Sequence, residues 1–170
     1  GNVKRTGLVT STPLSFGNPF NTIHFDAATV TLPTDITVNL VKSAPANFTA
    51  VTRTYAITAT GGSGLSATLR LHYKDAELNA NAESALQLWR LNGGNWTPQG
   101  QAARDATDNW VELSGVTSFS SWSLASCSSL STTSQFFNQM GGPGSVALTM
   151  RTTSPWAVAV SDPSWISLTS

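Results

Sequence analysis

The sequence predicts an all-β protein that begins with an antiparallel β-sandwich, and three observations lead to this prediction. The chain of 170 residues is 40% hydrophobic but only 11% charged, and small polar residues and Gly make up much of the remainder. β-Branched and aromatic residues alternate with polar ones over short segments, as expected for half-buried strands. Turn residues recur between these segments without any helical period, which favours a sandwich.

The first strands are predicted from β-branched alternation that ends at turn residues. Residues 1–16 alternate weakly and are followed by the turn sequence "GNPFN". Segments 22–33 and 35–45 carry β-branched residues at a period of two and end on Pro, which cannot continue a central strand. Segment 48–64 places Val51, Arg53, Tyr55 and Ile57 on one face before a glycine-rich turn.

The clearest strand lies at residues 65–73, where Leu, Ala and Tyr alternate with Ser, Thr, Arg and His. Residues 85–100 read as a strand, an Asn-Gly-Gly hairpin turn and a second strand. Residues 108–126 supply two further strands. We expect Trp89, Trp110 and Trp122 to be core residues because each lies within an alternating apolar face.

Residues 74–84 interrupt the strand pattern with helix-forming residues, which predicts a short helical turn. Acidic and Asn residues occupy every second position from Asp75 to Glu83, as in a calcium-binding loop. The glycine and the bidentate Glu of such a loop are missing. A solvated connection without a metal is therefore the favoured interpretation.

The charge balance argues against several partners. Nine basic and nine acidic residues give a formal net charge of zero, so nothing steers the chain toward nucleic acid. No apolar run reaches the length of a membrane span.

His24 and His72 are the only histidines, and no nucleophile elbow, metal motif or phosphate loop is present. We expect a protein that is not an enzyme and has no cofactor.

Residues 69–125 contain a run of spaced motifs. A strand ending in Tyr-x-Asp precedes a short Glu-Leu turn, a Leu-x-Leu-Trp strand, a Gly-Gly-x-Trp hairpin and a closing Phe-Ser-x-Trp strand. The run resembles a β-sandwich segment that recurs in secreted and cell-surface bacterial proteins. This resemblance implies an extracellular scaffold and no particular chemistry.

A second resemblance covers residues 128–168. They include a Phe-Phe strand, a Gly-Gly-x-Gly-Ser-Val turn at residues 141–146, and strands at Trp156 and Trp165. The segment resembles the first half of a BACON domain, an Ig-like module of secreted bacterial proteins, which implies carbohydrate or mucin binding. We therefore expect a β-sandwich domain at residues 1–126 and a partial Ig-like β-module at residues 127–170. Another chain, or residues absent from this sequence, would complete that module.

Two functions follow as expectations. The first is a structural subunit of a bacterial surface filament or polymer, in which copies of the chain are joined by strand addition. Its expected interface comprises apolar residues near both ends of the sequence: Val3, Leu8, Val9, Trp156, Trp165, Ile166 and Leu168. The alternative is a carbohydrate-binding or adhesive module of a larger secreted protein, with polysaccharide as partner and Trp96 as the ligand-binding residue. Both place the protein outside the cell or on its surface.

Overall fold

The computed structural model describes residues 1–46 and 48–126. This part of the chain is all-β, which confirms the predicted fold class. In chain order the strands are β1 (Asn2–Thr6), β2 (Leu14–Ser15), β3 (Thr22–Phe25), β4 (Asp35–Val41), β5 (Thr54–Thr60), β6 (Ala67–His72), β7 (Leu86–Asn92), β8 (Asn95–Gly100), β9 (Ala103–Asp105), β10 (Trp110–Val116) and β11 (Ser121–Ser126). Two single-turn 3-10 helices, η1 (Asp75–Glu77) and η2 (Glu83–Ala85), lie between β6 and β7, where the sequence predicts a helical turn.

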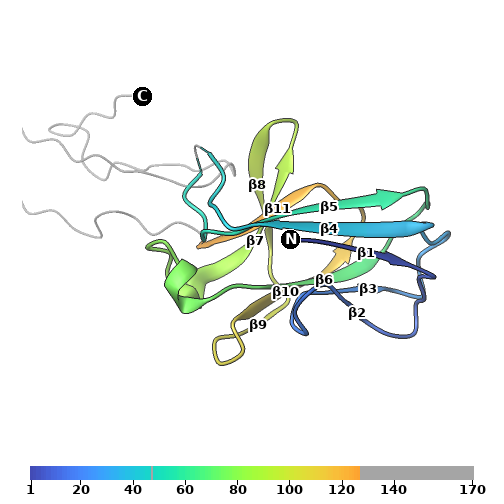
Figure 1. The fold of residues 1–170 in the computed structure, drawn as a ribbon, viewed down its shortest axis with the longest axis horizontal. Helices are drawn as coiled ribbons and strands as arrows, with labels where there is room; N and C mark the ends of the chain where they lie inside the picture. Colours follow the sequence, from blue (N-terminus) through green and yellow to red (C-terminus); the bar gives the residue numbers. More distant parts are fainter. Residues whose placement is uncertain (47, 127–170) are drawn as a thin grey trace, which may run out of the picture.

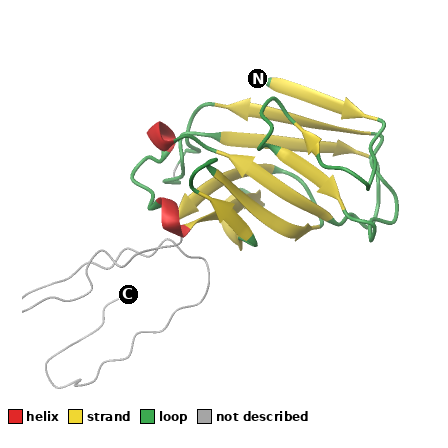
Figure 2. Cartoon of the chain, turned by 90° about the horizontal axis from the view of Figure 1, so that it is seen from below, coloured by secondary structure: helices red, strands yellow, loops and turns green. Residues whose placement is uncertain are grey.

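The strands form two antiparallel sheets packed face to face, so the β-sandwich prediction is also confirmed (Figures 1 and 2). One sheet has six strands in the order β1-β4-β5-β11-β7-β8, and the other has five in the order β2-β3-β6-β10-β9. β5 lies between β4 and β11 and pairs with both, although β11 is far from β5 in the sequence. The sandwich therefore depends on long-range pairing.

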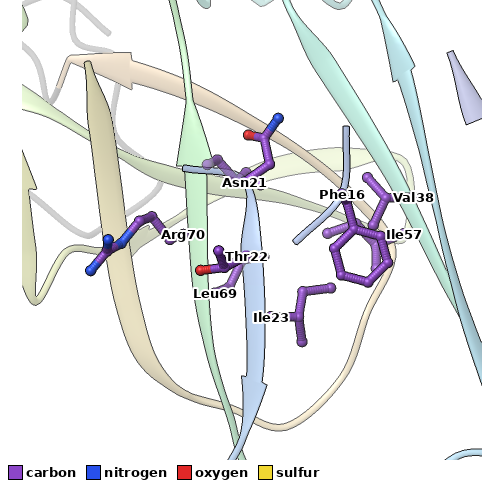
Figure 3. Close-up of a pocket in the computed structure, with 9 residues that line it drawn as sticks. Phe16, Asn21, Thr22, Ile23, Val38, Ile57, Leu69 and Arg70 are labelled. Carbon is purple, nitrogen blue, oxygen red and sulfur yellow. The ribbon is translucent and has the colours of Figure 1, made fainter. Parts of the chain in front are cut away.

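The core lies between the sheets and is built from the alternating residues of each strand. On β6 and just beyond it, Ala67, Leu69, Leu71 and Tyr73 are buried, as the alternation predicts. The small apolar pocket in Figure 3, lined by Phe16, Ile23, Val38, Ile57 and Leu69 among others, has no space that a water molecule could occupy. The interior is therefore closely packed around these strands.

The β7–β8 hairpin turns on the predicted Asn-Gly-Gly sequence. Asn92 pairs with Asn95, so Gly93 and Gly94 form a two-residue loop. Both have positive φ, at 56° and 87°. A hairpin loop that needs positive φ at two successive positions favours glycine, which has no Cβ to clash.

Two of the three tryptophans expected in the core are there. Trp89 and Trp122 are 2% and 1% exposed. Trp110 is only half-buried, which corrects the prediction for that residue. It lies on the outer face of the five-stranded sheet, where the Arg70 guanidinium covers its ring at 3.9 Å from the centroid.

The first strand, β1, pairs with β4 of the same chain, from Asn2 opposite Asn39 to Thr6 opposite Asp35. Val3 packs against the core and Leu8 is buried, whereas Val9 is 41% exposed. Val3 and Leu8 are thus used within the domain itself. The other expected interface residues, Trp156, Trp165, Ile166 and Leu168, lie outside the described residues.

The edges of both sheets carry features that hinder direct strand addition. On β1, Lys4 and Arg5 are exposed, and Lys4 Nζ lies 3.1 Å from Asp35 Oδ2. On β8, Pro98 has no backbone N–H to offer. The other two edge strands are very short, with two residues in β2 and three in β9. In the described part of the chain no helix is long and apolar enough to span a bilayer.

Candidate functional site

A groove of about 420 Å³ opens between the two sheets beside β1. One wall comes from β1, β4 and β5. The other comes from the loop between β2 and β3 and from the end of β6. Polar residues line the groove alongside apolar ones, among them Asn18, Asn21 and Arg53.

Arg53 lies at the base of the groove with its side chain 4% exposed. It precedes β5 on the inward face of that segment, so its guanidinium points into the sandwich and needs a counter-charge. Glu77 of η1 supplies one: its Oε1 accepts from Arg53 Nη2 at 2.9 Å. Its Oε2 lies 2.8 Å from Nε, but that N–H does not point at the oxygen closely enough for a hydrogen bond.

The second guanidinium nitrogen of Arg53 connects Tyr55 with His72. Nη1 donates to Tyr55 Oη at 3.2 Å, to the His72 carbonyl at 3.2 Å and to His72 Nδ1 at 3.1 Å. Tyr55 also donates to the His72 carbonyl, at 2.5 Å. Because a guanidinium can only donate, Nδ1 accepts, and the neutral imidazole carries its proton on Nε2.

Asn21 fixes the other side of this network. It is buried, and its Oδ1 accepts the His72 backbone N–H at 2.7 Å. Phe20 stacks on the His72 ring, with 6.1 Å between centroids and 19° between planes. The position of the imidazole is therefore fixed by three contacts: the hydrogen bond of the His72 backbone N–H, the hydrogen bond to Nδ1 and the stacked Phe20 ring.

The surroundings shift the pKa values of the three titratable groups in different directions. Burial lowers the pKa of His72, and the nearby Arg53 charge lowers it further. Burial raises the pKa of Tyr55 above its usual value. Burial alone would lower the pKa of Arg53, but hydrogen bonding to Glu77 and the adjacent Tyr55 outweigh it and raise the pKa. At neutral pH the network holds a charged Arg53 beside neutral His72 and Tyr55.

The lowered pKa of His72 predicts a loss of stability in mild acid. The unfolded chain binds a proton on this group near pH 6.5, whereas the folded chain binds it only at lower pH. Stability is therefore complete above about pH 6.5 and declines as the pH falls toward the folded-state pKa. Urea unfolding of the parent and of H72N between about pH 5 and 7 measures this effect.

Asparagine keeps an acceptor near the position of Nδ1 but does not titrate, so H72N should show a flatter decline. H24Q, which removes the other histidine, is the control for the loss of an imidazole elsewhere in the domain. Equal slopes for the parent and H72N would contradict the assignment.

Two exposed lysines complete the groove. Lys42 follows β4 and Lys74 follows β6, so they stand on opposite sheets, and both line the groove. None of the described residues that line it is acidic. Although the whole chain has a net charge of zero, this concave region is locally cationic.

The polar residues of the connection between β6 and β7 bind separate partners in the protein. The hydrogen bonds are of ordinary length and join Asp75 with Asn109 at 2.8 Å, Glu77 with Arg53 at 2.9 Å, Asn79 with the Ala50 carbonyl at 2.8 Å, Asn81 with the Leu78 carbonyl at 2.8 Å, and Glu83 with Tyr73 at 2.7 Å. The expectation of a solvated connection is thus wrong for Asn81, which is buried. No group of three or more metal-ligating side chains occurs in the described ranges.

Trp96, the tryptophan expected to bind ligand, is half-buried and lies outside the groove. Its ring stacks on Phe48, at 5.3 Å and 7°, and Phe48 in turn packs against Trp89 at 4.9 Å. One face of Trp96 is therefore covered by the protein. The structure does not bring Trp96 together with Val3, Leu8 or Val9 into one site.

The sequence interpretation did not select Arg53, Tyr55, Lys42 or Lys74 as site residues. One signal for the site was present: Arg53 alternates with three apolar residues that face the core. A charged residue at an inward position requires a buried partner, and such networks often line functional sites.

No family model, curated protein or solved structure matches the chain. Evidence about function therefore comes from the geometry of the molecule.

Proposed function

We propose that the chain is a non-enzymatic carbohydrate-binding or adhesive module of a larger extracellular protein, and that its ligand occupies the groove beside β1. The observation that carries this proposal is the groove itself, a concave surface whose base is formed by Arg53, Tyr55 and His72, which hydrogen-bond to one another. The volume of about 420 Å³ suits a small-molecule ligand or one unit of a polymer.

The groove offers the contacts that a saccharide needs. Val3 and Leu40 supply apolar surface for the C–H faces of a sugar ring, and Asn18 and the lysines supply polar groups for its hydroxyls. The Arg53 network keeps the walls in place without a ligand, so little conformational entropy is lost on binding. Since Arg53, Tyr55 and His72 bind one another, the arrangement favours recognition over acid–base chemistry.

Backbone NMR spectra recorded with a panel of oligosaccharides test this proposal. We expect at least one saccharide to shift the amide signals of Asn18, Lys42 and His72 together. Shifts that centre on Trp96 and leave the groove unchanged would contradict the groove as the site. If no saccharide in a broad panel shifts any signal at millimolar concentration, the carbohydrate-binding function fails.

A filament subunit is the second candidate, and the position of β1 favours it. β1 is an edge strand with mostly exposed side chains, and only Val3 points into the core. The same strand could pair with β4 of a neighbouring copy and make identical contacts there, which is domain swapping. When β1 is exchanged between copies, no strand has to add to an existing sheet edge, so the edge features described above do not hinder the assembly.

Deletion of residues 1–11 tests the exchange of β1. If β1 joins copies, the intact chain forms assemblies whose size rises with concentration, and the deletion abolishes them. Light scattering measures the size of both proteins. An intact chain that stays monomeric at high concentration would contradict the filament function.

A further inference from the structure

We propose that the groove selects acidic saccharides, and that the carboxylate or sulfate of the sugar binds between Lys42 and Lys74. This inference rests on the proposed function of the groove and adds the class of ligand. It depends on three observations: Lys42 and Lys74 stand on opposite walls, the Glu77 carboxylate is paired with Arg53, and the Arg53 side chain is buried among partners of its own.

The two lysines stand on opposite walls. Lys42 directly follows β4 in the six-stranded sheet, and Lys74 lies just after β6 in the five-stranded sheet. Neither has an ion pair with any described residue, whereas Lys4, Arg53 and Arg70 each pair with a carboxylate. A ligand anion would therefore meet two cations that no acidic side chain has neutralised.

Glu77 does not offset these charges, because it is paired with Arg53. Its two carboxylate oxygens lie 2.8 and 2.9 Å from guanidinium nitrogens. The pair is close to neutral as a unit, so among the described side chains that line the groove only Lys42 and Lys74 carry an unpaired charge. A concave surface of one sign concentrates field and attracts ligands of the opposite sign, most strongly at low salt.

The guanidinium of Arg53 is not itself the anion site. Its Nη1 and Nη2 donate to Tyr55, His72 and Glu77, and its side chain is 4% exposed. A ligand that displaced Glu77 would break this buried ion pair. The acidic group is therefore expected at the rim, near the lysines, with the sugar ring against the apolar wall formed by Val3 and Leu40.

Isothermal titration at low ionic strength tests the inference with tetrasaccharides of three kinds. One is neutral (maltotetraose), one carries carboxylates (tetragalacturonate) and one carries sulfates (a sulfated maltotetraose). A tetraglutamate peptide provides the same chemical group without a sugar. We expect the carboxylated or the sulfated tetrasaccharide to bind more tightly than the neutral one, and added salt to weaken that binding. The relative affinity of these two acidic sugars distinguishes carboxylate from sulfate as the preferred group.

K42Q and K74Q should each weaken binding of the acidic saccharide by about threefold to fivefold, as expected for exposed charge pairs. The double variant should weaken it by about tenfold to twentyfold, because separate contacts are roughly additive. K4Q is the matched control: it removes the same charge from β1 outside the groove, and its affinity should stay within about twofold of the parent. Thermal unfolding confirms that these surface variants fold.

The outcomes separate the inference from the proposed function. If the neutral tetrasaccharide binds in the groove as tightly as the acidic ones, or the double variant binds like the parent, charge selection is wrong while the proposed function stands. If tetraglutamate binds as tightly as the acidic saccharides, the saccharide class is wrong. If none of the saccharides binds the parent protein, both the inference and the carbohydrate-binding function fail.

Discussion

Replacing Glu77 with glutamine is expected to lower the free energy of unfolding by about 3 kcal/mol, because it leaves Arg53 as a buried charge without a counter-charge. The guanidinium is 4% exposed and the Glu77 side chain 15%, so water screens the pair weakly. Glutamine fits the same space, which makes the change electrostatic rather than steric. Urea unfolding of the parent and of E77Q at pH 7 measures the difference.

D75N is the matched control for this prediction. Asp75 lies in the same 3-10 helix but is exposed, and its carboxylate accepts from Asn109 at the surface. We expect D75N to change stability by less than about 0.5 kcal/mol. The double variant R53M/E77Q removes both charges and should recover much of what E77Q loses. A loss below about 1 kcal/mol for E77Q would show that the ion pair is unimportant to stability.

Replacing Trp122 with alanine should cost about 3–5 kcal/mol through lost burial and the cavity left behind. Trp122 is 1% exposed and lies on β11, between β5 and β7 in the middle of the six-stranded sheet. Its indole N–H has no hydrogen-bond partner among the described residues, so no hydrogen bond is lost and most of the cost comes from packing, beside a contact with the Arg90 guanidinium at 5.9 Å from the ring centroid. Chemical denaturation of W122A and of the parent provides the measurement.

W110A provides the comparison, because Trp110 is half-buried on the outer face under Arg70. We expect it to cost about 1–2 kcal/mol, clearly less than W122A. If the two variants lose equal stability, or if W122A loses less than about 1 kcal/mol, then burial does not distinguish the two tryptophans as described.

Much of the fold could be predicted because its signals are local. The alternation on β6 predicted the buried face from Ala67 to Tyr73, and the Asn-Gly-Gly sequence predicted the β7–β8 hairpin. The helix formers after β6 predicted one short helical turn, and the structure has two there. Each of these features depends on residues that are close in sequence, so spacing and turn chemistry are sufficient.

Strand partners could not be predicted in the same way. The sequence of β1, "NVKRT", has one inward apolar residue, Val3, and such a strand does not specify its neighbour. Its pairing with β4 depends on the twist and position of the whole sheet. The half-buried position of Trp110 is a different case, because the period of two places Trp110 on the face of Glu112, opposite the buried Val111.

The groove was not predicted because its lining comes from five separate parts of the chain, around residues 1–3, 16–21, 38–42, 53–55 and 72–74. Only the inward position of Arg53 marked the site in the sequence. The partners of the polar residues between β6 and β7 were equally hidden. Alternation gave them the spacing of a calcium loop, but the fold directs each one to a different neighbour.

The placement of β1 also has a mechanical consequence. Asn2 of β1 lies level with Ser121, where β11 begins, because Asn2 pairs with Asn39, Asn39 with Ala56 and Ala56 with Ser121. β1 is an edge strand held by β4 alone, so tension between residues 2 and 126 would separate β1 from β4 first. β11 is held on both sides, and Ser126 is anchored to Asn81, so that end would resist longer. Since Val3 lines the groove, pulling would open the groove before the sandwich itself unfolds.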